Sequence, residues 1–281
     1  MKFSDASSQG SITGTVCLVT GASRGIGRAL AAALAEAGAL VALASRTGEA
    51  LDELVEEIAR SGGRALGCVA DVSKWEQVDS LYAIVRREMG PVELLVNNAA
   101  VITPVGAVEE IDPHEWKEAL EINVTGAFYC SKRALETMVP RRKGTIINLV
   151  SGMGERVFAR FSAYSVSKAA LIHLTRILAA EVREHGVCVC AVDPGLVDTG
   201  MQEQLRAMPA ERVGIEMHSR LIQYKREGML RPAAEIARQL VGVIRSGALS
   251  LERSGELVSL GRLYAQGSLR VQGRPDPTRR H

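Results

Sequence analysis

The chain has 281 residues, of which 47% are hydrophobic and 23% are charged, a composition typical of a globular protein with a sizeable core. Its formal net charge of +2 gives no reason to expect a nucleic-acid partner. Because no apolar run is long enough to cross a bilayer, and the polar start lacks the apolar segment of a signal peptide, we predict a cytoplasmic protein without a membrane partner.

The five cysteines are odd in number and lie mostly within apolar runs. This pattern is typical of reduced, buried thiols in a reducing compartment rather than of a disulfide framework. Cys188 and Cys190 alternate along one apolar run, which indicates a shared strand face more than a metal site. The histidines have no ligand spacing either, so we predict that the protein binds no metal.

Short apolar runs alternate with helical patterns along the chain. The pattern predicts strands over 15–20, 40–45, 65–70, 92–97, 144–150, 187–192 and 256–260. It predicts helices over 25–37, 48–60, 75–88, 113–139, 162–185 and 232–246. The strands are continuously apolar, as expected when helices cover both faces of a sheet. We therefore predict an α/β protein with a doubly wound parallel sheet (a Rossmann fold) of about seven strands.

The composition shows no break that would indicate a second large domain. We predict one domain over 14–261, after a polar lead at 1–13 and before a basic tail at 262–281. The tail is interpreted as a solvated end or a subunit-contact arm rather than a nucleic-acid-binding arm. Residues 196–231 are weakly patterned and follow the sixth strand, where a substrate loop or lid is expected.

The stretch TGASRGIG, residues 20–27, joins the first predicted strand to the first predicted helix. It is consistent with a tight turn, or with a phosphate cradle built from backbone N–H groups and a helix N-terminus. In the cradle, Gly21 allows the turn, Gly25 allows close approach of a diphosphate, and Gly27 allows helix–strand packing. The side chains between them, Ser23, Arg24 and Ile26, are further candidates for cofactor contacts.

The end of the second predicted strand bears on the choice of dinucleotide. NAD-binding folds place a carboxylate there for the ribose 2′-hydroxyl. This chain has Ser45 and Arg46 instead, and its first carboxylate comes only at Glu49. Arg46 and Arg24 would both suit a 2′-phosphate, since a guanidinium binds two phosphate oxygens at once. The alternative is that both arginines are simply solvated surface residues. Because two separate positions agree, we favour NADP(H) as the cofactor.

A candidate acid–base pair follows the fifth predicted strand. Tyr164 and Lys168 are four residues apart on a predicted helix, so they project from one face. A phenol has an ordinary pKa near 10, and a nearby ammonium together with an oxidised nicotinamide would favour the phenolate. Ser151 would donate a hydrogen bond to the substrate oxygen. Each residue alone also fits a purely structural role: Tyr164 as a packed ring, Lys168 as a solvated amine and Ser151 as part of a turn.

Together these residues resemble the short-chain dehydrogenase/reductase family over about residues 14–260. The resemblance rests on Thr20-Gly21-x-x-x-Gly25-x-Gly27, Asp71, Asn97-Asn98-Ala99, Asn123, Ser151, Tyr164-x-x-x-Lys168 and Pro194-Gly195-x-Val197-x-Thr199. It implies that Tyr164 is the general acid/base, that Ser151 positions the carbonyl, that Lys168 binds the nicotinamide ribose and that Asn123 anchors a relay water. It also implies cofactor contacts from Asp71, Val72, Asn98, Ala99, Ala100, Pro194, Gly195, Val197 and Thr199.

Two positions depart from the family pattern. The family's Asn-Asn-Ala-Gly ends here in Ala100, and we expect the added methyl group to be tolerated. The last strand continues into Ser259-Leu260-Gly261 without the family's Asp-Gly-Gly ending, which puts the C-terminal subunit contact in question. The resemblance further implies a homo-oligomer, a tetramer or a dimer, with the helices over 113–139 and 162–185 packed across a two-fold axis.

We therefore predict an NADP(H)-dependent oxidoreductase that interconverts a ketone and a secondary alcohol. The alternative from another class is a non-catalytic NADP(H)-binding sensor or scaffold of the same fold. A sensor needs the glycine turn but not the set of Asn, Ser, Tyr and Lys. The substrate stays open among steroids, acyl thioesters, aromatic diketones and sugars, although the Met- and Phe-containing segments favour an apolar pocket.

Overall fold

The computed structural model describes residues 10–261, so the predicted basic tail and residues 1–9 of the polar lead lie outside the described residues. Of the predicted polar lead, residues 10–13 are described, and they contact the domain predicted from residue 14 onward. The Gly10 N–H donates to the carbonyl oxygen of Arg245 at 2.7 Å, and Ile12 is buried. Ile12 is the apolar residue of this segment, and its side chain packs into the core.

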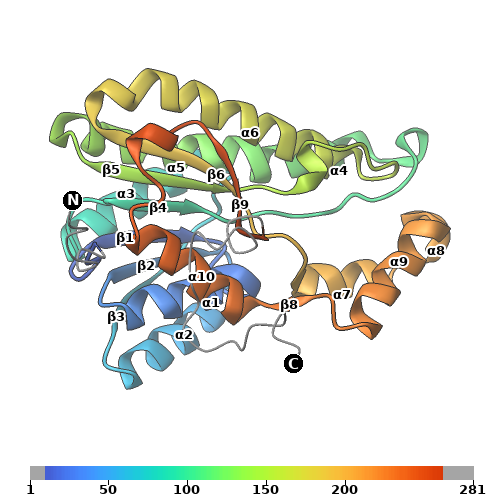
Figure 1. Cartoon of the computed structure of the whole chain (residues 1–281), viewed down its shortest axis with the longest axis horizontal. Coiled ribbons are helices and arrows are strands. Elements are labelled where there is room, and N and C mark those ends of the chain that lie inside the picture. Colours follow the sequence, from blue (N-terminus) through green and yellow to red (C-terminus); the bar gives the residue numbers. More distant parts are fainter. Residues whose placement is uncertain (1–9, 262–281) are drawn as a thin grey trace, which may run out of the picture.

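A single parallel sheet of seven strands forms the centre of the molecule (Figure 1). Its strands are ordered β3-β2-β1-β4-β5-β6-β9. Their bounds are β1 (Val16–Thr20), β2 (Leu40–Ser45), β3 (Arg64–Val69), β4 (Leu94–Asn97), β5 (Gly144–Leu149), β6 (Val187–Asp193) and β9 (Leu257–Ser259). The chain runs outward from β1 to β3 and then crosses to β4, so the strand order reverses between β1 and β4. This doubly wound topology, which the sequence predicts, opens a ligand crevice at the reversal.

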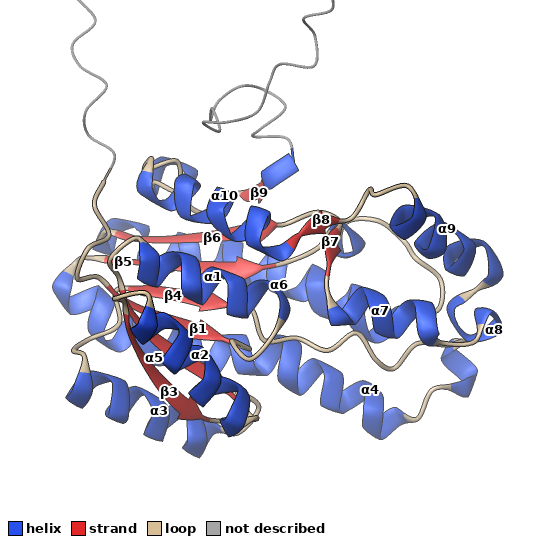
Figure 2. Cartoon of the chain, turned by 90° about the horizontal axis from the view of Figure 1, so that it is seen from below, coloured by secondary structure: helices blue, strands red, loops and turns tan. Residues whose placement is uncertain are grey.

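Helices cover both faces of the sheet (Figures 1 and 2). One face is covered by α1 (Gly25–Glu36), α2 (Gly48–Arg60) and α10 (Ala233–Arg245), and the other by α3 (Trp75–Glu88), α5 (Gly126–Arg141) and α6 (Ser162–Val182). Neighbouring strand residues alternate between the two layers: Val19 packs in the first core and Leu18 in the second. Both are fully buried, which explains why the strands are continuously apolar.

The helix predicted over 113–139 has an interruption that the sequence does not reveal. It consists of α4 (Pro113–Leu120), a π-helical turn at Glu121–Thr125 and then α5. The Asp112 carboxylate caps α4 by accepting a hydrogen bond from the His114 N–H at 2.7 Å. Because a π turn adds a residue without changing the apolar composition, the pattern alone predicts one long helix.

The weakly patterned segment 196–231 forms short helices and two short strands. It contains β7 (Val197–Asp198), α7 (Gly200–Ala207), α8 (Ala210–Val213), α9 (Ile215–Arg226) and β8 (Arg231–Pro232), and β7 pairs with β8. Each of its three helices buries a single residue, so the amphipathic signal is weak. Figure 2 shows the segment projecting from the end of the main sheet.

Short 3₁₀ turns complete the described chain at Val108–Glu110, Gly152–Gly154, Arg183–His185 and Leu251–Arg253. All five cysteines are free and buried. The sulfur atoms of Cys188 and Cys190 lie 3.6 Å apart, which confirms that both side chains occupy one face of β6.

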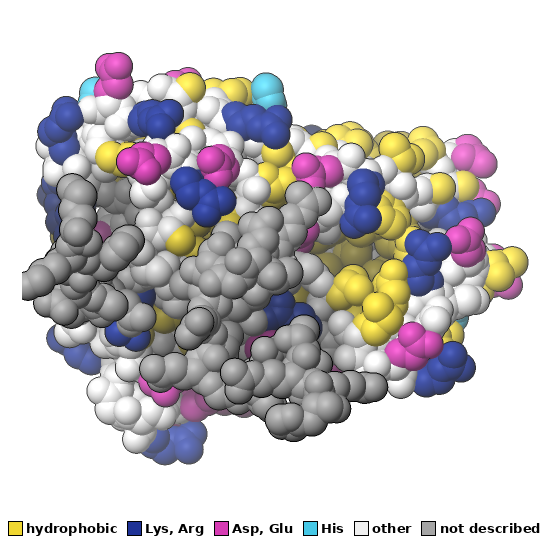
Figure 3. Space-filling model, in the orientation of Figure 1, with side chains coloured by type: hydrophobic (Ala, Val, Ile, Leu, Met, Phe, Trp, Pro, Cys, Tyr) yellow, Lys and Arg dark blue, Asp and Glu magenta, His cyan; other side chains and the backbone are white. Residues whose placement is uncertain are grey.

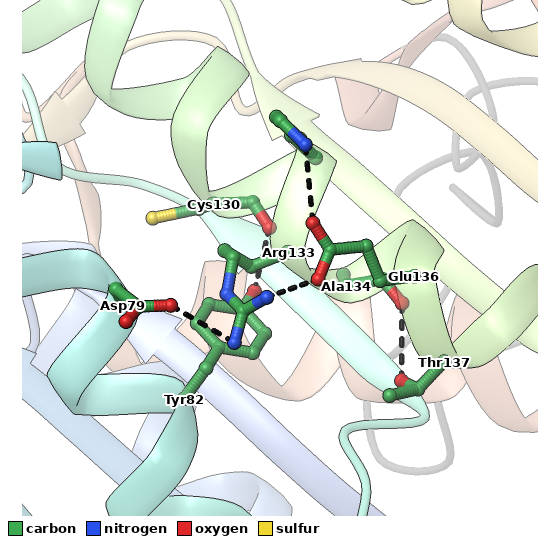
Figure 4. A network of polar contacts seen from close by, with 8 residues as sticks. Asp79, Tyr82, Cys130, Arg133, Ala134, Glu136 and Thr137 are labelled. Atoms are coloured by element: carbon green, nitrogen blue, oxygen red, sulfur yellow. Dashed lines mark hydrogen bonds and ion pairs between the residues drawn. The ribbon is translucent and has the colours of Figure 1, made fainter.

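A polar network fixes α3 against α5 (Figure 4). The Arg133 guanidinium on α5 contacts Asp79 on α3 at 3.0 Å and Glu136 on its own helix. Next to it, the phenol of Tyr82 donates to the carbonyl oxygen of Cys130 at 2.7 Å. Tyr82 is buried, so this hydrogen bond is shielded from water. The contact holds in place the helix that continues from the π turn.

Candidate active site

A cleft of about 430 Å³ opens at the carboxyl ends of the strands, where the strand order reverses. It runs from the loop after β2, across the glycine turn, to the first turn of α6 and the start of α7. Most of the predicted cofactor residues line it: Gly21, Ser23, Arg24, Gly25, Ile26, Ser45, Arg46, Asp71, Val72, Asn98, Ala99, Ala100, Tyr164, Lys168, Pro194 and Thr199.

The glycine turn between β1 and α1 has the geometry of a cradle. Gly21 and Gly25 adopt positive φ angles of 64° and 57°, which other residues rarely adopt. A Cβ at Gly21 would lie 2.8 Å from the Cα of Ala99, and one at Gly27 would lie 2.3 Å from the Gly21 carbonyl oxygen. Gly21 and Gly27 therefore let β1, α1 and the end of β4 approach one another closely, whereas a Cβ at Gly25 would meet only the Thr199 side chain at 3.4 Å. Gly27 does this packing from outside the cleft lining.

Thr20 and Asn98 fasten this turn to the neighbouring strand. The Thr20 hydroxyl accepts hydrogen bonds from the N–H groups of Asn98 and Ala99 at 3.0 and 3.1 Å. The Asn98 amide donates to the carbonyl oxygens of Thr20 and Gly21 at 2.8 and 3.0 Å. Its amide therefore organises the cradle. Ala100 has no positive φ, so its methyl group adds no backbone strain.

The other end of the cleft is lined by side chains that suit an adenosine ribose and its phosphate. Ser45 is buried and receives a hydrogen bond from the Thr47 N–H at 3.1 Å, which shapes the loop after β2. Arg24 and Arg46 are both exposed there. Asp71 accepts hydrogen bonds from Ser73 rather than pairing with either arginine. Glu49 does not line the cleft. The residues present fit a dinucleotide, and no carboxylate follows β2 directly.

Asn123 lies on the π turn and is almost fully buried. Its amide oxygen accepts from the Val101 N–H at 2.8 Å, and its amide nitrogen donates to the Val101 carbonyl oxygen at 2.9 Å. The same nitrogen donates to the Ser167 hydroxyl at 3.0 Å, and this hydroxyl donates to the Tyr164 carbonyl oxygen at 2.7 Å. Asn123 therefore joins the loop after β4 to the helix that carries Tyr164 and Lys168.

Ser151, Tyr164 and Lys168 meet at the carboxyl end of β5. Tyr164 and Lys168 are 8% and 3% exposed, and both lie in the first two turns of α6. The side chains of Ser151 and Tyr164 are hydrogen-bonded to each other. The Lys168 Nζ donates to the Leu149 carbonyl oxygen at 2.8 Å and lies 5.5 Å from the centre of the Tyr164 ring.

The environment shifts the pKa values of both Tyr164 and Lys168. Burial raises the pKa of Tyr164 to about 12, the hydrogen bond with Ser151 lowers it in part, and the charge of Asp193 raises it again. Burial lowers the pKa of Lys168 to about 8. Lys168 alone therefore does not bring the phenol below its ordinary pKa. That the pKa of Tyr164 falls toward neutral pH when the oxidised cofactor is bound stays a prediction.

Some predicted site residues lie beside the cleft instead of lining it. Asn123 and Ser151 make the hydrogen bonds described above. Gly195 is exposed with a φ of 77°, and its N–H donates to the Asp193 carboxylate at 2.9 Å. Val197 is buried in β7, where it is paired with Arg231 of β8. Both help shape the turn that brings Pro194 and Thr199 to the cleft.

Sequence reasoning missed several residues of the site. Those that line the cleft are Ala44, Thr47, Ala70, Val101, Ile102, Thr103, Ile122, Leu149, Val150, Gly200 and Gln204. Ala44, Ala70 and Val150 could have been found, because they lie at or next to strand ends. Ser167 carries no comparable signal, since a helical serine beside a lysine is uninformative until its partner Asn123 is known.

A second apolar cluster, called the substrate chamber below after the role proposed for it, adjoins the tyrosine end of the cleft, and Ile102, Tyr164 and Met201 belong to both. Its buried members are Ile102, Val105, Phe161, Tyr164, Leu205, Val213 and Leu221, with Met153, Phe158, Met201, Met208 and Met217 packed against them. Figure 3 shows hydrophobic side chains around a hollow between α6 and α7, with Lys and Arg side chains at its border. Ile222, in the same segment 196–231, is 46% exposed and lies outside the cluster.

Comparison with known proteins agrees with this architecture. Residues 15–210 match the family model described as short chain dehydrogenase. A 3-oxoacyl-[acyl-carrier-protein] reductase from Synechocystis sp. is 37% identical over 199 residues, covering 70% of this chain and 80% of that protein. A 2,3-dihydro-2,3-dihydroxybenzoate dehydrogenase from Bacillus subtilis is 35% identical over 196 residues, covering 70% of this chain and 75% of that protein.

Solved structures give the same result. A variant of actinorhodin polyketide ketoreductase with NADPH has a TM-score of 0.79 at 30% identity, over 87% of this chain and 95% of that one. An NAD⁺-bound xylitol dehydrogenase has a TM-score of 0.78 at 27% identity, over 89% of this chain and 98% of that one.

The chain therefore belongs to the short-chain dehydrogenase/reductase family. Enzymes of this family are oxidoreductases that act on CH–OH and C=O groups with NAD(H) or NADP(H). Within residues 10–261, no helix has the length and apolar character needed to span a membrane.

Proposed function

We propose that the protein is an NADP(H)-dependent oxidoreductase that interconverts a ketone and a secondary alcohol. The observation that carries this proposal is the cleft itself. Its inner end holds Tyr164 and Lys168, and its outer end holds Arg24 and Arg46 without a carboxylate after β2. Among the similar structures, one ketoreductase was solved with NADPH, and one gluconate 5-dehydrogenase, described as putative, was solved with bound NADP.

When bound, the nicotinamide supplies or accepts the hydride. The chain's own residues handle the oxygen atom of the substrate. In the reducing direction, the phenol of Tyr164 donates its proton to the carbonyl oxygen, and Ser151 donates a hydrogen bond to the same atom. Because burial raises the pKa of Tyr164 to about 12, the phenol keeps this proton at neutral pH in the protein alone. This protonation state suits the reducing direction.

Lys168 and Asn123 support that proton donor. The buried Lys168 is held against the Leu149 carbonyl oxygen, which fixes its amine beside the phenol. Asn123 fixes the first turns of α6 through Ser167. A sensor protein would require the cradle and the arginines but not a buried acid–base cluster, so this cluster favours the enzyme over the sensor.

The test is Tyr164→Phe, which keeps the ring and removes the phenolic proton. We expect NADPH-dependent reduction across a ketone panel to fall by at least ~10²–10⁴-fold, the usual cost of losing a general acid. The NADPH dissociation constant and the melting temperature should change little, because the cradle and the arginines are untouched. Retention of most activity on a good substrate would show that Tyr164 is not the acid.

A further inference from the structure

Arg156 lies over the residue that follows Ser151. The 3₁₀ turn Gly152–Gly154 reverses the chain after β5, and the Arg156 N–H donates to the Gly152 carbonyl oxygen at 3.1 Å. A methyl group on Gly152 would lie 2.8 Å from the Arg156 Nη2. The guanidinium therefore occupies space that any side chain at Gly152 would fill, next to the catalytic serine.

An aromatic ring holds this guanidinium at the substrate chamber. The Arg156 Cζ lies 5.7 Å from the centre of the Phe158 ring, within the range of a cation–π contact. Phe158 is partly buried and packs against the chamber that contains Tyr164. Arg156 is exposed and does not itself line the cleft, but its contact with Phe158 places the charge at the solvent edge of the apolar cluster that shares Tyr164 with the cleft.

Arg156 forms no ion pair with any residue in the range 10–261, whereas Arg133 and Arg231, for example, each contact a carboxylate. Asp193 also faces Gly152, with its Oδ2 3.6 Å from the same added methyl position. Asp193 is therefore near Arg156 without forming an ion pair with it. A guanidinium has five N–H donors, so it can bind another oxygen ligand even beside a carboxylate. The donors of Arg156 are thus open to a ligand at the chamber.

We propose that Arg156 determines specificity by binding a carboxylate of the substrate, so that the enzyme acts on oxo and hydroxy acids with an apolar body. The inference rests on the proposed function, because it assigns a substrate class to the same site. The apolar chamber receives the body of such a molecule, and Ser151 and Tyr164 receive its ketone oxygen. The guanidinium can bind both oxygens of a carboxylate at once, whereas the neutral ester of the same acid offers no charged pair of oxygens.

The test compares matched acids and esters. NADPH oxidation is followed with 4-oxocyclohexanecarboxylate and with its methyl ester, and with a linear pair, 6-oxoheptanoate and its methyl ester. We expect the acids to have at least tenfold higher kcat/KM in the unmutated protein. Arg156→Gln should lower kcat/KM for the acids roughly 10–100-fold, the effect of losing a charge-assisted contact, and leave the esters within about twofold. Arg156→Lys should recover part of the loss.

Arg220→Gln is the matched control, because Arg220 lies on α9 and is paired with Glu216 at 2.8 Å. It should leave the acid-to-ester ratio unchanged. Esters reduced as readily as acids by the unmutated protein, or an equal loss on both in Arg156→Gln, would overturn the role of Arg156 while leaving the proposed function intact. A protein that reduces no member of either pair or of the ketone panel would overturn both proposals.

Discussion

Among the glycines of residues 10–261, Gly27 is the one where an added methyl group would lie closest to a neighbouring atom. It lies in the first turn of α1, and a Cβ there would be 2.3 Å from the Gly21 carbonyl oxygen and 2.4 Å from the Asn98 amide nitrogen. Neither atom belongs to a flexible surface side chain, since one is backbone and the other is held by two hydrogen bonds. We therefore predict that Gly27→Ala damages both stability and cofactor binding.

The size of the effect follows from these distances. To reach an ordinary contact of 3.4 Å, α1 and the turn after β1 must separate by roughly 1 Å. Overpacking of this kind costs about 1–3 kcal/mol, and weakening the two hydrogen bonds of Asn98 adds about 1 kcal/mol. A loss of about 2–4 kcal/mol corresponds to a melting temperature lowered by roughly 5–15 °C in a chain of this size.

The assay combines thermal unfolding, followed by circular dichroism, with a fluorescence titration of NADPH. Gly67→Ala on β3 is the control, because a Cβ there would meet its nearest neighbour, the Cβ of Leu51, at an ordinary 3.4 Å. The control should keep the NADPH affinity and most of the stability. An unchanged melting temperature and an unchanged NADPH affinity in Gly27→Ala would refute the packing role assigned to this glycine.

Two further predictions concern the cofactor and the subunit contact. Arg46→Asp should weaken NADPH binding by roughly 10–100-fold and improve the relative use of NADH, since it removes a phosphate partner and adds a carboxylate for the 2′-hydroxyl; comparable kcat/KM for NADPH and NADH in the unmutated protein would contradict the premise. Phe128→Glu should dissociate the expected homo-oligomer, because Phe128 on α5 and Val166 and Ile177 on α6 are 42%, 47% and 43% exposed; sedimentation of the unmutated chain as a monomer at micromolar concentration would contradict this expectation.

The seven strands of the main sheet could be predicted to within two residues because helices cover both faces of that sheet, whereas the sequence pattern does not predict the short strands β7 and β8. The central strands then appear as short, continuous apolar runs between helical patterns, as in Val16–Thr20 and Val187–Asp193. The cofactor cradle could be predicted for a related reason. Its glycines are required by local backbone geometry, and this requirement is visible in a single stretch of sequence.

The parts that could not be predicted depend on contacts between distant segments. The π turn could not be predicted because its role depends on hydrogen bonds of Asn123 with Val101 and Ser167, which are distant in the sequence. The helices of 196–231 bury so few residues that their periodicity is weak. The position of Arg156 follows from the reversal at Gly152, so nothing in the local pattern distinguishes it from other exposed arginines.

Burial also determines how Lys168 should titrate when the cofactor binds. Burial lowers the pKa of Lys168 to about 8 in the protein alone, whereas donation to a ribose hydroxyl would favour the ammonium and raise that pKa. Binding then takes up a proton near and above pH 8. The NADPH dissociation constant should therefore be flat below about pH 7, rise about twofold by pH 8, and rise further above it by at most about tenfold per pH unit. Tyr164→Phe should keep this profile, because burial raises the pKa of Tyr164 to about 12 and the phenol does not titrate in this range. Lys168→Met should bind NADPH more weakly and without the rise. An equal rise in Lys168→Met would show that another group takes up the proton, and that Lys168 does not contact the cofactor through its charge.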